Sequence, residues 1–192
     1  MLNTGEELIR SKNKLLTTIG YKLDSEVCYA LEGSIFMAGS LIQWLRDQMG
    51  ILESAEDSEK KALDADPESR VFVMPAMTGL GAPHWVSDAK GAIFGLTMGS
   101  GQNEISLAAL EAVAFQSKEL INAMEADGGK ITSLKVDGGM SKNNYFAQIL
   151  ANTIKKDICR PKNIETTALG AAYLAALGSG FATKSEITNF WQ

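Results

Sequence analysis

The chain has 192 residues, of which 45% are apolar, enough to bury the core of a globular domain. Eighteen basic and 23 acidic residues leave a net charge of −5, and without a basic cluster this balance argues against a nucleic-acid partner. No apolar run approaches the roughly 18 residues of a membrane span, so we expect no membrane partner. Cys28 and Cys159 lack ligand or disulfide spacing, which predicts no metal site and a reducing, cytoplasmic compartment.

The elements follow one another in the order expected of an α/β domain. Residues 1–5 have the composition of a turn, and a β-hairpin or meander follows them. Strands then alternate with helices, which is typical of an α/β domain with a mixed sheet, and we expect one domain over residues 1–192. Periodicity predicts strands at 15–19, 26–31, 71–75, 92–96, 131–136 and 156–160, and helices at 34–50, 103–129, 141–156 and 166–177, with a short helix and a surface loop within 53–69. The spacing also predicts which positions of the two longest helices are apolar and buried: Ile35, Ala38, Leu41, Ile42, Leu45 and Met49 in the first, and Ile105, Ala108, Ala109, Ala112, Val113, Leu120 and Met124 in the second.

The strongest local signal for ligand binding is the run 136–144, where an apolar strand leads through paired glycines into a helix. Gly138 and Gly139 lack a Cβ where the chain turns, so a ligand can approach the backbone. The following helix, with Ser141 as its expected N-cap, offers free N–H groups to an anion, and Asn143 in its first turn can present its amide to a base or a phosphate. A tight strand-to-helix turn without any ligand explains the same glycines, so both interpretations stay open.

A second signal is a glycine within the predicted helix 34–50, for which Ser34 is the expected N-cap. Glycine inside a helix costs about 1 kcal/mol relative to alanine, so Gly39 indicates that something packs closely at that point. Gln43 lies four residues further on and therefore on the same face. A ligand beside the helix and a helix–helix crossing both account for this pair, and a crossing is the more common cause.

Residues 78–85 read Thr-Gly-Leu-Gly-Ala-Pro-His-Trp, which is neither a GxGxxG fingerprint nor a P-loop. His84 is the only histidine and has no partner for a metal site or a triad, so we expect it to be structural. Trp85 is expected to pack the loop down rather than to stack on a substrate. Asp137 could act as a base but also fits a simple turn, and Glu111 is expected to be a paired structural carboxylate, so no carboxylate is predicted to be catalytic.

Taken in chain order, these segments resemble the C-terminal domain of the glycerol kinase branch of the FGGY carbohydrate kinase family. The Thr-Gly-Leu-Gly-Ala-Pro run separates that branch from relatives that act on xylulose, ribulose or gluconate. His84 and Met98 depart from the family's usual tyrosine and arginine, which puts subunit contacts and regulation in question rather than the reaction. The resemblance extends to about residue 181, through matching runs at 1–5, 15–19, 29–33, 43–47, 78–85 and 91–111.

The resemblance implies a ribonuclease H-like, actin-like ATPase fold, in which two α/β domains close around ATP. This chain is then expected to be most of the domain on the nucleotide side. The family's nucleotide contacts correspond to Gly39 and Gln43, near the phosphates, and to Gly139 and Asn143, near the α-phosphate and the base. Each pair contains a glycine for which the sequence pattern alone leaves two explanations.

The resemblance also implies what this chain lacks. The glycerol site, the general base and the phosphate loop with its magnesium-linked aspartate belong to the N-terminal domain or to segments before Met1. We therefore expect this chain to be a fragment without catalytic residues and without activity alone, with Mg²⁺ held by the phosphates of ATP or ADP and by that domain. The intact protein is expected to phosphorylate glycerol from ATP and to form a homo-oligomer, while the exposed cleft face of the fragment should self-associate.

Two alternatives remain at this point. The first is that the intact protein is another sugar or polyol kinase of the same family, because the acceptor site lies outside this chain. The second is an actin-like nucleotide-binding module that senses or scaffolds and catalyses nothing. Acceptor profiling separates the first alternative from glycerol phosphorylation, and the presence or absence of a kinase domain upstream of Met1 separates the second.

Overall fold

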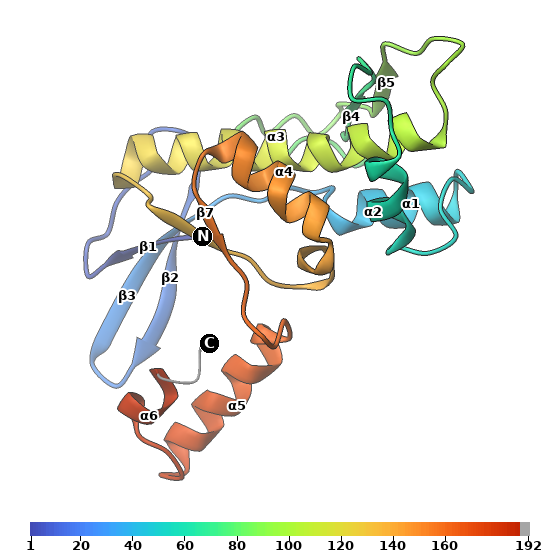
Figure 1. Ribbon diagram of the computed structural model, residues 1–192. Helices are drawn as coiled ribbons and strands as arrows, with labels where there is room; N and C mark the ends of the chain where they lie inside the picture. The colour runs from blue at the N-terminus through green and yellow to red at the C-terminus, as the bar shows by residue number, and fades with distance from the viewer. Residues whose placement is uncertain (189–192) are drawn as a thin grey trace.

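A long helix, α3 (Gln102–Gly128), runs across the domain in the computed structural model, which describes residues 1–188, and the other elements lie around it (Figure 1). Residues 189–192, which the sequence analysis includes in the domain, lie outside the described residues. The helix ends at Gly128 with Gly129 as its C-cap, as predicted. Small residues along its buried stripe let neighbouring elements approach its backbone closely; the predicted stripe positions that are buried are Ala108, Ala109, Ala112, Val113, Leu120 and Met124.

Strands of both orientations are present, as predicted, but in the described part of the chain they form three separate hydrogen-bonded sheets. The first is antiparallel with the order β1-β3-β2, the second is an antiparallel pair and the third a parallel pair. Their strands are β1 (Leu2–Gly5), β2 (Leu16–Leu23) and β3 (Glu26–Glu32); β4 (Phe72–Met74) and β5 (Ala92–Phe94); and β6 (Ser133–Lys135) and β7 (Asp157–Cys159).

The main core lies where three other helices meet α3. The amphipathic helices α1 (Gly39–Asp47), α2 (Asp57–Leu63) and α4 (Asn144–Ile154) pack there together with β4. Leu41, Ile42 and Leu45 of α1 are buried, as predicted, whereas Met49, which was predicted on the same face, lies after the helix and is 46% exposed. A second, smaller cluster under the first sheet contains Leu31 and Leu120.

The start of α1 differs from the prediction. The helix begins at Gly39, with Ala38 as its N-cap residue, and not at Ser34. The carbonyl oxygen of Ser34 accepts a hydrogen bond from the amide of Ala82 (3.1 Å), and so the segment before the helix follows an irregular path against a distant loop. Gly39 is therefore the first residue of a helix rather than an interior one, and the helix-interior cost assumed for it does not apply.

The start of α4 differs as well. Residues Gly139–Lys142 form a short 3-10 helix, and the predicted N-cap Ser141 turns its hydroxyl back to the carbonyl oxygen of Gly138 (2.7 Å). The N-cap of α4 is Asn143, whose side-chain oxygen accepts from the amide of Phe146 (2.7 Å). Asparagine and serine are both good N-caps, so the residue types alone did not decide between them.

Two further elements were not predicted. Strand β1 occupies the supposed turn at residues 1–5, because Leu2 pairs opposite the fully buried Leu31 of β3. The short helix α6 (Lys184–Thr188) follows α5 (Thr166–Gly178), and an ion pair between Lys184 and Glu26 (2.5 Å) ties it to the first sheet. Strand β1 depends on a pairing partner far away in sequence, which a local pattern does not show.

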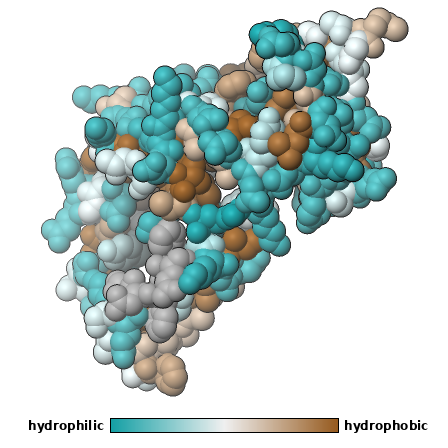
Figure 2. Space-filling model, in the orientation of Figure 1, coloured by the Kyte–Doolittle hydropathy of each residue, from teal (hydrophilic) through white to brown (hydrophobic). Residues whose placement is uncertain are grey.

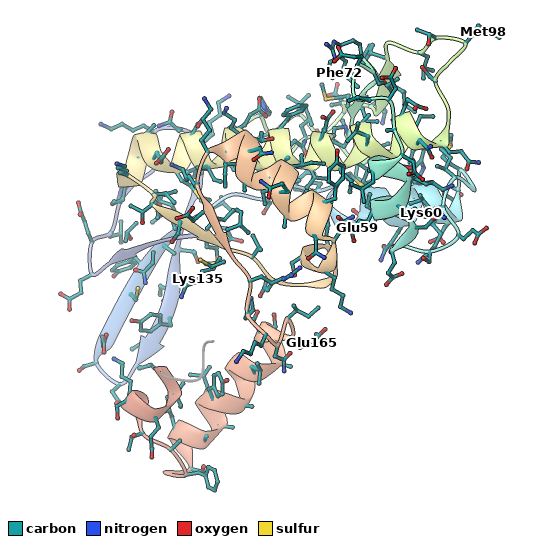
Figure 3. All side chains as sticks on the ribbon, in the orientation of Figure 1. Glu59, Lys60, Phe72, Met98, Lys135 and Glu165 are labelled. Carbon is teal, nitrogen blue, oxygen red and sulfur yellow. The ribbon has the colours of Figure 1, made fainter. Side chains whose placement is uncertain are left out.

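Apolar surface is left open at the edge of the domain. Figure 2 shows one face that is mostly hydrophilic, with apolar surface gathered in separate patches. The outer face of the β4–β5 pair presents Phe72, Met74 and Phe94, which are 48%, 43% and 57% exposed. Met98 lies at the tip of the loop after β5 and points away from the body of the domain (Figure 3). No helix among the described residues is long and apolar enough to span a bilayer.

Candidate functional site

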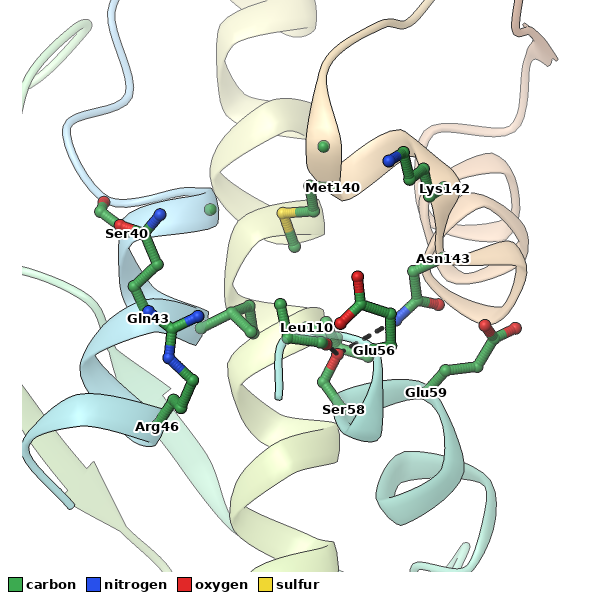
Figure 4. A pocket seen from close by; sticks show the side chains of 14 residues that line it. Ser40, Gln43, Arg46, Glu56, Ser58, Glu59, Leu110, Met140, Lys142 and Asn143 are labelled. Atoms are coloured by element: carbon green, nitrogen blue, oxygen red, sulfur yellow. Dashed lines mark hydrogen bonds between the residues drawn. The ribbon is translucent and has the colours of Figure 1, made fainter. Parts of the chain in front are cut away.

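The four residues singled out from the sequence line one pocket of about 330 Å³ (Figure 4). Gly39 and Gln43 come from α1, Gly139 from the 3-10 helix, and Asn143 from the N-cap of α4. These segments are far apart in sequence and meet because α1, α2 and α4 all pack on α3. The sequence analysis did not single out the remaining polar lining residues, which are Ser40, Arg46, Glu56, Ser58, Glu59 and Lys142.

The α1 wall of the pocket is open at Gly39. A Cβ placed on this residue would have no atom within 4 Å, apart from its own neighbours in the chain and helix. No helix crosses close to it, so the helix-crossing explanation for this glycine is wrong. Gln43 lies one turn further along the same face and also lines the pocket. The space beside Gly39 is therefore free for a ligand.

The opposite wall is open in the same way at Gly139. Gly138 has φ +78°, in a region that residues with a side chain rarely adopt, so this glycine is required by the turn itself. Gly139 has no such backbone requirement, and a Cβ on it would also meet nothing within 4 Å. The turn thus explains Gly138 but leaves Gly139 facing open space in the pocket lining.

Asn143 is held in place at the floor of the pocket. Its side-chain oxygen caps α4, and its side-chain nitrogen donates to the hydroxyl of Ser58 at the start of α2 (3.3 Å). The hydroxyl of Ser58 in turn donates to the carbonyl oxygen of Ala55 (2.6 Å). The amide therefore holds a fixed orientation. A ligand that uses it would replace the long contact to Ser58 and leave the helix cap intact.

Charges of both signs line the pocket. Hydrogen bonds from its own backbone amide and from Ser54 hold the pKa of Glu56 below its usual value, and the positive charges of Lys142 and Arg46 act in the same direction. Arg46 is itself bound to Asp47 through two nitrogen–oxygen contacts (2.6 and 3.0 Å), which raise its pKa. Glu56 is therefore ionised at neutral pH, between two cations.

Helical spacing is the one sequence signal that pointed to any of the unexpected lining residues. Arg46 follows Gln43 by three residues on the same helix, so it belongs to the same face. Glu56, Ser58 and Glu59 carry no such signal, because their place in the pocket depends on how α2 docks on α3 and α4.

The other candidate residues lie outside the pocket. His84 contacts Glu119 of α3 (3.0 Å), and the Trp85 indole donates to the carbonyl oxygen of Lys14 (2.7 Å), so Trp85 packs its loop down as expected. The hydroxyl of Thr166 donates to the carboxylate of Asp137 at a close contact. Burial raises the pKa of Glu111, and the charge of Arg70 partly offsets this. Among residues 1–188 there is no group of three or more His, Cys, Asp or Glu side chains able to hold a metal ion.

Comparison with known proteins assigns the chain to a family. The model of the FGGY family of carbohydrate kinases, C-terminal domain, matches residues 1–179. The chain belongs to the FGGY family of carbohydrate kinases. The glycerol kinase of Lactobacillus delbrueckii subsp. bulgaricus is 53% identical over 182 residues, which are 94% of this chain and 36% of that protein. This FGGY domain thus spans less than two fifths of the length of that curated relative.

Solved structures confirm the predicted fold class. The glycerol kinase of Plasmodium falciparum, solved with ADP, superposes with a TM-score of 0.87 at 35% identity, covering 99% of this FGGY domain and 38% of that chain. A ligand-bound xylulose kinase of Lactobacillus acidophilus gives a TM-score of 0.79 at 24% identity over 99% of this chain and 38% of that chain. At that identity the second likeness shows the fold alone, the actin-like ATPase fold of these kinases.

Proposed function

We propose that this chain is the nucleotide-binding half of a glycerol kinase that transfers the γ-phosphoryl group of ATP to glycerol. One observation carries the proposal: Gly39, Gln43, Gly139 and Asn143 line the same pocket, and two of them are glycines whose Cβ would project into open space. The relatives favour glycerol as acceptor, because a glycerol kinase is 53% identical to this chain. An ADP-bound glycerol kinase shares its fold, which supports an adenine nucleotide as the ligand.

The charges of the pocket favour one placement of the nucleotide. The carboxylates of Glu56 and Glu59 would repel phosphates but accept hydrogen bonds from ribose hydroxyls or an exocyclic amine. The phosphates would then lie along the glycines, where Gly39 and Gly139 let them approach the backbone amides. Lys142 lies on the Gly139 side and would offset part of their charge.

Catalysis requires parts that this chain does not supply. The described residues contain no group of three or more His, Cys, Asp or Glu side chains that could hold a metal ion. We propose that Mg²⁺ arrives on the nucleotide phosphates and that an N-terminal domain supplies the base, the glycerol site and the remaining magnesium ligands. Phosphoryl transfer is mostly positioning and charge neutralisation, so both walls of the cleft are needed.

The proposed setting is the cytoplasm, where ATP is the common phosphoryl donor. The state of the cysteines supports a reducing compartment, because Cys28 and Cys159 are both free thiols in the described structure. We further propose that the intact enzyme is a homo-oligomer, which the open apolar face of the β4–β5 pair supports.

The acceptor is tested with the longer protein that contains this chain. A coupled assay for ADP release with glycerol, xylulose and gluconate should show turnover with glycerol far above the two sugars. Turnover on xylulose or gluconate instead would replace glycerol by another acceptor of the family. ADP binding without turnover on any acceptor would support the non-catalytic module. The 192-residue chain alone should give no turnover, and measurable activity would contradict the division of labour proposed here.

A further inference from the structure

The loop at residues 78–86 lines no part of the nucleotide pocket, yet it is built with unusual internal order. Leu80 and Val86 each donate an amide hydrogen bond to the other's carbonyl oxygen (2.8 and 3.0 Å). The amide of Trp85 donates across the loop to the carbonyl oxygen of Gly81 (2.8 Å). A loop that is held this firmly can fix the position of whatever packs against it.

The segment that packs against it is 33–38, which connects β3 to α1. The amide of Ala82 donates to the carbonyl oxygen of Ser34 (3.1 Å). A Cβ on Gly81 would lie 2.1 Å from that same oxygen and 3.1 Å from the ring of Phe36. The first distance is shorter than any non-bonded contact allows, so only glycine permits this approach of the two backbones.

Trp85 makes the second contact with this segment. Its backbone has φ +57°, a left-handed conformation that is costly for a bulky residue and persists only where the surroundings impose it. The indole is held by the carbonyl oxygen of Lys14 (2.7 Å) and meets the Phe36 ring edge-on, with ring centroids 6.4 Å apart. Trp85 is 44% exposed. The strained backbone therefore serves to bring the indole into contact with Phe36 and Lys14 and does not serve to bury the ring.

The contacted segment leads directly into the pocket. Only Met37 and Ala38 separate Phe36 from Gly39, the first residue of α1. Met37 is buried in the main core, and the carbonyl oxygen of Ala38 accepts a hydrogen bond from the amide of Leu41 (3.0 Å). Both residues are therefore held in place. Phe36 is thus joined to the start of α1 through these two residues.

We infer that Gly81 and Trp85 are positioning residues for the nucleotide site, acting through Phe36 on the start of α1. The identity of the ligand rests on the proposed function, but the effect of the loop on the position of α1 does not depend on any ligand. The loop contributes no atom to the pocket lining and sets the separation of the two walls that are open for the phosphates. It also explains why a helix predicted from Ser34 begins only at Gly39.

The test compares variants of the 192-residue chain by calorimetric titration with MgADP and by amide NMR of the empty protein. Gly81→Ala should weaken MgADP binding by about three- to tenfold and shift the amide resonances of Gly39 and Gln43. Where that chain fails to fold, Trp85→Ala and Phe36→Ala provide the same test. If Trp85 acts through Phe36, the variant that carries both Trp85→Ala and Phe36→Ala should lose no more MgADP affinity than the single variant with the larger loss.

Phe94→Ala is the matched control, because this aromatic side chain is 57% exposed on β5 and lies outside the pathway to α1. It should leave both the affinity and the Gly39 resonance unchanged. Additive losses in the double variant, or unshifted Gly39 and Gln43 amides, would overturn the inference. Absence of MgADP binding by the unsubstituted chain would count against the proposed nucleotide site, and the NMR comparison would still decide the positioning role.

Discussion

Gln43 on α1 and Asn143 at the N-cap of α4 face each other across one pocket, although they lie in different thirds of the chain (Figure 4). Each is paired with a glycine whose Cβ would meet no atom, Gly39 on one wall and Gly139 on the other. Two unrelated local patterns thus contribute to a single site. An amide and open backbone on each wall are consistent with the nucleotide proposed as the ligand.

Asn143→Asp separates the structural role of this residue from its proposed binding role. Aspartate keeps the oxygen that caps α4, so the free energy of unfolding should change by less than about 1 kcal/mol. It loses the donor nitrogen and adds a negative charge that repels phosphate, so MgADP should bind about tenfold more weakly. Chemical denaturation and calorimetry measure the two effects. Asn143→Ala is the comparison, since it should lose about 1 kcal/mol of stability through the missing cap.

Replacement by alanine should affect ligand binding at Gly139 but stability at the adjacent Gly138. Gly139→Ala places its Cβ in open space, so stability should stay within about 0.5 kcal/mol while MgADP binding weakens. Gly138→Ala must adopt φ +78°, and this should cost about 1–3 kcal/mol of stability. Thermal unfolding with and without MgADP measures both. Equal destabilisation by the two substitutions would show that Gly139 is also required by the turn.

Asp127 should make the stability of the chain depend on pH at the acid end. Its carboxylate accepts hydrogen bonds from Ser11 (2.5 Å) and from the side chain of Asn13 (2.7 Å), which joins the loop before β2 to the end of α3. Burial alone would raise the pKa of Asp127, but these hydrogen bonds outweigh it and the pKa is lowered. The stabilisation is therefore complete above the unfolded-state value of about 3.9 and is lost as the pH falls through the lower folded value.

Urea denaturation of the unsubstituted chain and of Asp127→Asn tests this linkage. The substitution should cost about 2 kcal/mol at pH 7, since hydrogen bonds to a charged acceptor are lost. The difference between the two proteins should shrink as the pH falls below about 4, where the unfolded chain begins to bind a proton at Asp127 that the folded chain binds only at lower pH. A difference that stays constant between pH 7 and pH 3 would show that the charge of Asp127 does not contribute.

The isolated chain should self-associate, and the structure points to the outer face of the β4–β5 pair as the contact rather than to the cleft face expected from the sequence. Phe72 and Phe94 lie directly opposite each other there and both are about half exposed. Phe72→Lys places a charge in that patch, so the mass measured by sedimentation equilibrium should fall toward the 20.6 kDa of one chain. Met49→Lys, at another exposed apolar residue, adds the same charge elsewhere and should leave the mass unchanged. A monomer at all concentrations before any substitution would contradict the prediction.

Local patterns predicted most elements but not their exact starts. The buried stripe of α3 and the centre of the apolar face of α1 were predicted correctly because periodicity reports directly which residues are buried, whereas Met49, predicted on the α1 face, is exposed. The start of α1 was missed because a hydrogen bond from Ala82 to Ser34 holds the preceding segment out of the helix, and β1 was missed because only β3 makes it a strand. In each case a partner distant in sequence overrides a local preference.

In the candidate site too, residues with a local sequence signal were predicted and residues placed by distant packing were not. The glycines and amides of the two walls were found from residue type and spacing together with the family resemblance. The carboxylates that α2 contributes, Glu56 and Glu59, were not found, because nothing in their own sequence reports that α2 docks beside Asn143.

The most direct test of the account is an NMR titration of this chain with MgADP, repeated with Gly139→Val. The account predicts saturable binding that shifts the amides of Gly39, Gln43, Gly139 and Asn143, and a roughly five- to hundredfold loss of affinity when the valine side chain fills the space beside the turn. Saturable binding that leaves these four amides unshifted, or that Gly139→Val does not weaken, would contradict the assignment of this pocket to the nucleotide.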